Sequence, residues 1–272
     1  MSGPIIAGTD FGPRADRAID RAIALGEQLG REVIVFHARD LPPYSTDDGH
    51  DLDAQLREVL PRGAQGVQFA YKSGSPPHAI GEYADEKNAE LIVLGVARHN
   101  SIGDYFLGTA VDNCIRRTDL PVLVVKKRPQ REYETIAIAT DFSEFSVRAA
   151  RWAAEMFPDA KLHLLHAFHV PYAAWNNAAY VTEEISGYAR EKMDEFMKAL
   201  PDEVQSRITT HVEKGMLTSA INTLIAREGI DLVVLGSHGE TGFRHATIGS
   251  QANSLLTSSI ADTVIIGPRV AD

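Results

Sequence analysis

Residues 231–239 read Asp-Leu-Val-Val-Leu-Gly-Ser-His-Gly, and residues 90–95 read Glu-Leu-Ile-Val-Leu-Gly. Each stretch contains a short, continuous run of branched apolar residues that ends on glycine. Such runs are typical of strands that are buried on both faces of a parallel sheet. Because the two stretches are versions of each other, we expect the chain to contain the same strand, and the loop after it, twice.

The sequence on either side of these stretches is repeated as well. Thr9-Asp10-Phe11 recurs as Thr140-Asp141-Phe142, and His37-Ala38 recurs as His166-Ala167, each pair at the end of an apolar run. The order is kept, while the spacing between equivalent positions grows from about 130 to about 141 residues. The period is too long for a solenoid and indicates two duplicated domains. The second copy is expected to carry an insertion around residues 170–180.

Within each copy, short apolar runs alternate with segments that have helical spacing of apolar residues. This alternation predicts an α/β fold, with two tandem open, doubly wound, five-stranded parallel sheets of the Rossmann-like kind. The expected strand order is 3-2-1-4-5 with helices on both faces. We place the domains at residues 1–127 and 134–272. The charged segment Lys127–Tyr133, which contains Pro129, is expected to link them.

Composition narrows the range of functions. The chain has 272 residues, of which 44% are hydrophobic, and a formal net charge of −10. A charge of this sign argues against a nucleic-acid partner and against docking on anionic lipid. The single cysteine, Cys114, cannot form an internal disulfide. We find no signal peptide and no membrane-spanning segment in the sequence, and we expect a cytoplasmic protein.

The candidate binding site is the loop that follows the fourth strand of the second copy. It reads Gly236-x2-Gly239-x9-Gly249-Ser250 and leads into a predicted helix. Glycines let backbone N–H groups approach an anion without a Cβ in the way. Ser250 lies where the helix starts, so its hydroxyl and the nearby amides can hold a phosphate at the positive end of the helix dipole. The pattern therefore predicts an anion cradle.

This spacing resembles the ATP-binding signature of the universal stress protein family, and the resemblance extends over nearly the whole chain, twice. It implies that ATP is the ligand, and that Gly236, Gly239, Gly249 and Ser250 contact its phosphates and ribose. It also implies that Asp141 lies near the ribose or the adenine edge, and that Ala167 offers backbone groups to adenine. It further implies a regulatory protein of the stress response that holds ATP rather than turning it over quickly. The two copies are expected to pack as a pseudo-dimer within the chain, and a homodimer is left open.

The first copy departs from this pattern. Its loop starts at Gly95 and closes with Gly108-Thr109, but Arg98 occupies the position of the second glycine. Either the first site is dead or altered, or Arg98 binds an anion through its guanidinium. We favour the first reading, which predicts one ATP per chain, held by the second copy.

Two rival functions stay open on the sequence alone. One is a slow ATPase in which Asp141 helps to place Mg²⁺, and the other is an interaction scaffold whose pockets hold a non-nucleotide ligand. The glycines could also serve only a turn, with Ser250 as an ordinary helix cap. No nucleophile–base pair or zinc-type set stands out, so no catalytic or metal-binding residue is assigned. His163, His166 and His169 alternate along a predicted strand and are not expected to share one ion.

Overall fold

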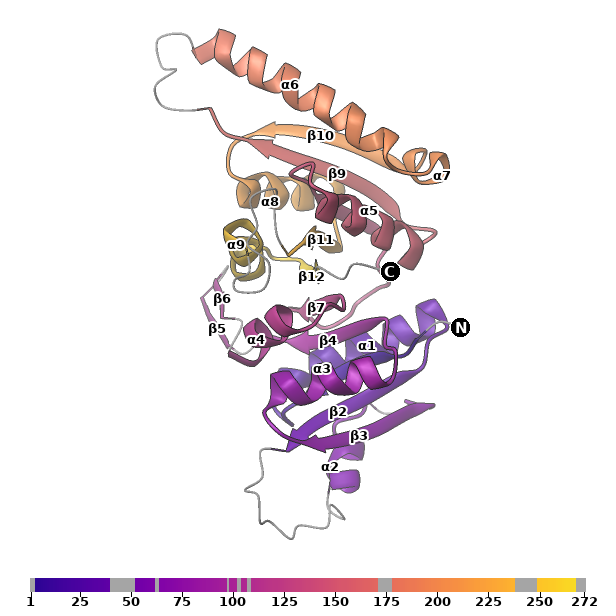
Figure 1. Ribbon diagram of the computed structural model, residues 1–272. Helices are drawn as coiled ribbons and strands as arrows, with labels where there is room; N and C mark the ends of the chain where they lie inside the picture. The colour runs from indigo at the N-terminus through magenta and orange to yellow at the C-terminus, as the bar shows by residue number, and fades with distance from the viewer. Residues whose placement is uncertain are drawn as a thin grey trace. The chain divides into compact units, whose positions relative to one another are not determined.

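A computed structural model describes residues 3–39, 52–61, 64–96, 98–101, 104–106, 109–170, 178–237 and 249–267 (Figure 1). The chain divides into two compact units, with the division between Glu132 and Tyr133. Among the described residues, each unit contains five parallel strands that form its main sheet. No described helix is long and apolar enough to cross a membrane.

The first unit alternates strands and helices in the predicted manner. Its elements are β1 (Ile5–Thr9), α1 (Ala15–Leu29), β2 (Val33–Arg39), α2 (Leu52–Glu58), β3 (Val67–Ser73), α3 (Pro76–Glu86), β4 (Leu91–Gly95), β5 (Arg98–Ser101), β6 (Asp104–Phe106), α4 (Thr109–Arg117) and β7 (Val122–Val125). The order across its main sheet is β3-β2-β1-β4-β7. This is the predicted order 3-2-1-4-5.

The second unit repeats this arrangement. Its elements are β8 (Thr135–Ala139), α5 (Glu144–Met156), β9 (Lys161–Phe168), α6 (Ala178–Lys198), α7 (Asp202–Gln205), β10 (Ile208–Lys214), α8 (Leu217–Glu228), β11 (Leu232–Gly236), α9 (Ser250–Ser258) and β12 (Asp262–Ile266). The order across its sheet is β10-β9-β8-β11-β12, again the predicted one.

The strand order fixes which helices share a face. In each unit the first two crossovers run in one direction across the sheet, and the last two run in the other. Since each crossover is right-handed, the two directions put their helices on opposite faces. In the second unit α5 and α6 therefore cover one face, and α8 and α9 cover the other (Figure 1). The central strands are buried: Ile136, Leu164 and Val233 are fully covered.

The structure differs from the sequence-based expectation in the first unit. The loop after β4 contains an antiparallel ribbon of β5 and β6, in which Arg98 pairs with Phe106. No strand was expected there. The insertion expected around residues 170–180 lies mostly outside the described residues, and α6, which follows it, has 21 residues where its counterpart α2 has 7.

Tyr133 corrects the predicted linker. Its ring is only 2% exposed, and its hydroxyl donates a 2.6 Å hydrogen bond to Asp262 Oδ2 within the second unit. The segment Lys127–Tyr133 is therefore not a linker throughout, since its last residue belongs to the second core. Because the segment is mostly charged, its composition gave no sign that Tyr133 is buried.

Candidate functional site

The residues proposed to bind ATP lie on the carboxyl ends of neighbouring strands in the second unit. Asp141 follows β8, Ala167 is near the end of β9, and Gly236 is the last residue of β11. Strand β8 pairs with β9 on one side and with β11 on the other. Because the strands are parallel, these three positions share one edge of the sheet. It is the edge at which crossovers leave in opposite directions, where doubly wound sheets bind their ligands.

The two ends of the predicted phosphate loop meet. The N–H of Gly249 donates a 3.1 Å hydrogen bond to the carbonyl oxygen of Ser237, directly after β11. Gly249 caps α9, and Ser250, its first residue, is exposed. The first-turn amides of a helix have no partner within the helix, so they face outward together with the Ser250 hydroxyl. Gly239 and the loop histidines His238 and His245 lie outside the described residues.

Gly236 has a packing role that the sequence did not reveal. A Cβ at this position would lie 2.9 Å from Phe145 Cβ and 3.2 Å from the Phe145 carbonyl carbon. The equivalent Gly95 is equally constrained, since a Cβ there would lie 2.7 Å from the Arg14 carbonyl oxygen. In both units the fourth strand thus packs against the start of the first helix, and this contact alone requires glycine. At Gly249 a Cβ would lie 3.4 Å from the Ser237 oxygen, which is tolerable.

Asp141 is held in a defined turn. Its Oδ1 accepts hydrogen bonds from the N–H (3.1 Å) and the hydroxyl (2.6 Å) of Ser143, which caps α5. The residue itself is exposed. The counterpart Asp10 makes a similar turn by accepting a 2.9 Å hydrogen bond from the N–H of Gly12. The turn is therefore a feature of both copies.

A phenylalanine with unusual backbone geometry follows each of these aspartates. Phe11 has φ of +60° and Phe142 has φ of +69°, a region that bulky residues seldom occupy. Each ring packs on the histidine at the end of the next strand, His37 or His166, with centroids 4.3 Å apart. Each histidine places Nδ1 2.9 Å from the carbonyl oxygen of the threonine that comes before the aspartate, Thr9 or Thr140. The repeated Thr-Asp-Phe and His-Ala motifs contain these residues, but the sequence alone did not show that the phenylalanine and the histidine pack together.

The first unit has a cavity of about 630 Å³ at the positions equivalent to the proposed ATP site. Asp10, Ala38 and Gly95, the counterparts of Asp141, Ala167 and Gly236, all line it. Its other walls include Phe36, Pro76, Ile80, Leu94, Val111 and Cys114. Burial raises the pKa of the Cys114 thiol to about 12, so this side chain stays protonated at neutral pH and is no nucleophile.

Among the described residues beside the two loops, chemical groups for catalysis are sparse. Among the residues that the structure describes, no three His, Cys, Asp or Glu side chains are grouped so as to hold a metal ion. What the second unit offers is a helix N-terminus, a hydroxyl and an oriented carboxylate at one sheet edge. This arrangement is suited to holding an anionic ligand with a polar body.

Comparison with known proteins agrees with the duplicated fold. The model of the universal stress protein family matches twice, over residues 1–126 and 132–267. This chain belongs to the universal stress protein family. As a tandem member, it is 25% identical over 295 aligned residues to the universal stress protein E homolog of Haemophilus influenzae, and the match covers 94% of each chain.

Other universal stress proteins match one copy or the fold. A relative from Methanocaldococcus jannaschii is 24% identical over 143 residues, which are 47% of this chain and 84% of that protein. The crystal structure of a universal stress protein from Archaeoglobus fulgidus covers 99% of this chain and all of its own, with a TM-score of 0.69 at 19% identity. At that identity the structural likeness shows the fold alone.

Proposed function

We propose that this universal stress protein binds ATP in its second copy and acts as a nucleotide-dependent regulator of a stress response. The observation that supports the proposal most is the hydrogen bond from Gly249 N–H to the Ser237 oxygen. This hydrogen bond holds the start of α9 at the sheet edge where Asp141 and Ala167 also lie. A triphosphate would meet the helix N-terminus and Ser250, while Asp141 would accept hydrogen bonds from the ribose.

Holding the nucleotide, rather than hydrolysing it, fits the groups present. Asp141 is the one carboxylate among the proposed contacts, and Ser143 already occupies its Oδ1. The rival is a slow ATPase in which Asp141 helps to place Mg²⁺. Release of phosphate from ATP with Mg²⁺, measured over hours, distinguishes the two. Release that Asp141→Asn abolishes would favour the ATPase.

The first copy favours a different ligand. Its cavity of about 630 Å³ retains Asp10, but apolar side chains such as Phe36, Ile80 and Leu94 line much of it. Arg98 replaces the second loop glycine. We therefore propose, as a second function, that this cavity holds a ligand other than ATP.

Native mass spectrometry of the purified protein tests both proposals. One copurified nucleotide per chain is expected, and Gly239→Val should remove it, because a branched side chain would occupy the space of a phosphate. Gly108→Val is the matched change in the first copy and should leave the nucleotide bound. Two equivalent ATP sites in the wild type would refute the asymmetry. Loss of nucleotide with Gly108→Val alone would reverse the assignment.

A further inference from the structure

The second unit has a cavity on the face of its sheet opposite to α8 and α9. It has a volume of about 430 Å³ and lies between α5 and α6, and we call it the α6 pocket. Side chains alternate along a strand, so His166 and Phe168, which line the α6 pocket, point away from the face that Ala167 occupies. The pocket thus opens on the other face from the proposed nucleotide site, and Asp141, at the sheet edge, borders both.

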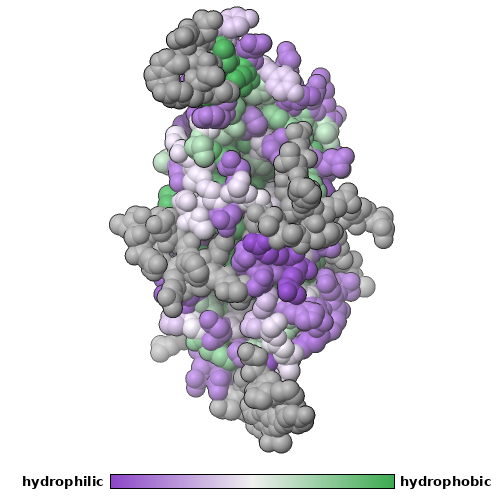
Figure 2. Space-filling view, turned by 60° about the vertical axis from the view of Figure 1, so that its left-hand side comes forward, coloured by the Kyte–Doolittle hydropathy of each residue, from purple (hydrophilic) through white to green (hydrophobic). Residues whose placement is uncertain are grey.

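Apolar side chains form most of the wall of the α6 pocket. They are Phe142, Val147, Phe168, Ile185, Ala189 and Phe196. Near the top of Figure 2, in the part of the second unit that carries α6, a strongly hydrophobic spot lies at the surface. Concave sites with an apolar wall and a few polar groups are the usual form of small-molecule sites.

The aromatic part of this wall is fixed in advance. Phe142 stacks on His166 with an interplanar angle of 29°, and its ring is tilted by 64° to the ring of Phe196 with centroids 6.3 Å apart. His166 is itself anchored on the Thr140 carbonyl oxygen at 2.9 Å. Because the ring of Phe142 is held on two sides, a ligand that packs on it would not have to order it first.

The charges at the mouth of the pocket disfavour anions. Lys192 lies 2.6 Å from Glu195 and sits over the ring of Tyr188 at 5.8 Å, so its ammonium is already paired. Asp141 adds a second carboxylate. The lining therefore holds one ammonium and two carboxylates. Tyr188 is 62% exposed and offers a ring that a ligand could cover.

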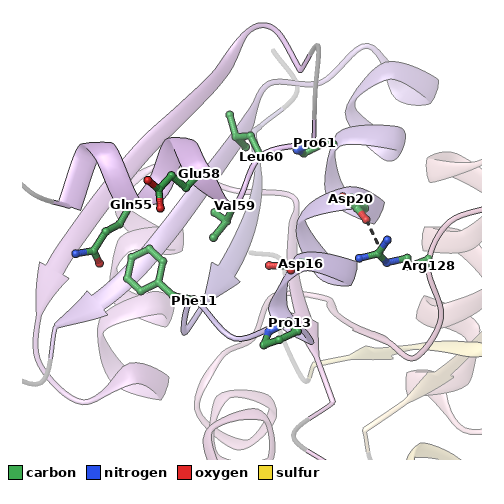
Figure 3. A pocket seen from close by; sticks show the side chains of 10 residues that line it. All are labelled: Phe11, Pro13, Asp16, Asp20, Gln55, Glu58, Val59, Leu60, Pro61 and Arg128. Carbon is green, nitrogen blue, oxygen red and sulfur yellow. Dashed lines mark ion pairs between the residues drawn. The ribbon is translucent and has the colours of Figure 1, made fainter.

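The first unit has a counterpart of this cavity with different chemistry. A cavity of about 510 Å³ lies next to Phe11, between α1 and α2 (Figure 3). Its lining includes the carboxylates of Asp16, Asp20 and Glu58, with Arg128 3.9 Å from Asp20. A cavity at this place is thus part of the fold in both copies, whereas an aromatic, weakly charged wall belongs to the second.

We propose that the α6 pocket is a second ligand site, which takes one small, uncharged aromatic molecule per chain. The flat ring faces of Phe142 and Tyr188 select an aromatic body, and the excess of carboxylates at the mouth excludes an anionic substituent. The proposal does not depend on ATP binding, because the apolar wall of the α6 pocket lies on the other face of the sheet and only Asp141 borders both sites.

Fluorescence titration with two related dyes tests it. N-phenyl-1-naphthylamine is uncharged and should bind saturably, once per chain. Its sulfonated relative 8-anilinonaphthalene-1-sulfonate has the same rings with a negative charge and should bind about tenfold more weakly or worse. Binding that does not saturate, or that favours the sulfonate, would overturn the proposal.

Variants on α6 locate the site. Ile185→Trp fills the pocket from a half-buried position and should lower the affinity for the uncharged dye by about tenfold or more. Glu184→Trp puts the same side chain on the exposed side of the helix and should leave the affinity unchanged. If Ile185→Trp disturbs folding, Tyr188→Ala at an exposed position serves instead and should also weaken binding. Equal affinities for the wild type, Tyr188→Ala and Glu184→Trp would place the dye elsewhere. Calorimetry with ATP on the same proteins is expected to show no change, which keeps the two proposals distinguishable.

Discussion

The imidazole rings of His163 and His211 stack with centroids 5.3 Å apart, and His163 Nδ1 lies 3.0 Å from His211 Nε2. Arg227 Nη2 lies 3.0 Å from His211 Nδ1 and can only donate. His211 Nε2 must therefore carry the proton and donate to His163 Nδ1. Both rings have to be neutral for this chain of hydrogen bonds to form, because an added proton would put two donors face to face.

The pair should make the second unit sensitive to mild acid. Burial lowers the pKa of His163, and burial together with the charges of His163 and Arg227 lowers the pKa of His211. Since the folded protein binds these protons less readily than the unfolded chain, the stabilisation is complete above the unfolded pKa of about 6.5. It is lost as the pH falls through that value toward the folded pKa.

Urea unfolding between pH 8 and pH 5.5 measures this effect. The free energy of unfolding of the wild type should fall across the interval, and the double variant His163→Gln, His211→Gln should show a smaller fall. His169→Gln, at an exposed position directly after the same strand, should behave like the wild type. Identical pH profiles for the double variant and the wild type would mean that the pair does not titrate in this range.

Ser250→Ala should weaken ATP binding without unfolding the protein. The hydroxyl is exposed at the start of α9, and a lost hydrogen bond to a charged group costs roughly 1.5–3 kcal/mol, or about 10- to 150-fold in affinity. Ser206→Ala removes another exposed hydroxyl, distant in sequence from the loop, and is the control. Calorimetry decides the matter, and an unchanged affinity in Ser250→Ala would remove this residue from the site.

Gly236→Ala and Gly95→Ala should destabilise the protein whether or not a nucleotide is present. The new methyl group would meet Phe145 in one case and the Arg14 backbone in the other, and such overpacking typically costs about 1–3 kcal/mol. Gly249→Ala should cost less, about 0.5–1 kcal/mol, because its nearest neighbour is 3.4 Å away and only the preference of the helix cap for glycine over alanine is lost. Thermal unfolding of the three apo variants tests the ranking. A stable Gly236→Ala protein that fails to bind ATP would instead restore a direct ligand role for that glycine.

Tyr133→Phe should lower the free energy of unfolding by about 1–3 kcal/mol, because it removes a hydrogen bond from the buried carboxylate of Asp262. Tyr180→Phe removes a hydroxyl from a residue that is 71% exposed and should have little effect. Chemical denaturation of both variants gives the comparison. Equal stabilities would show that the buried pair contributes nothing net.

The sequence predicted the fold more completely than it predicted the contacts between distant segments. Continuous apolar runs reveal buried strands, and the duplication shows the same alternation of strands and helices twice, so the parallel sheets could be predicted. The pairing of His163 with His211, 48 residues apart, could not, because each looks like an isolated histidine on its own strand. The burial of Tyr133 was missed for the same reason, since its partner Asp262 lies 129 residues further along.

The candidate site divides in the same way. The loop pattern identified Gly249 and Ser250 at a helix start, and local geometry is what such patterns encode. It could not show that Gly236 meets Phe145, because that contact depends on how closely a helix approaches the sheet. The αL phenylalanines were equally hidden, since nothing in the letters Thr-Asp-Phe specifies a positive φ.

The contacts of Gly95 and Gly236 have a consequence for how duplicated copies can diverge. A glycine that the helix–strand contact requires is retained by selection for folding, even in a copy that no longer binds its original ligand. Positions with no such packing role are free to drift once that ligand is lost. When two copies of this domain are compared, a glycine at position 95 or 236 therefore reports that the domain still folds, whatever ligand the copy binds.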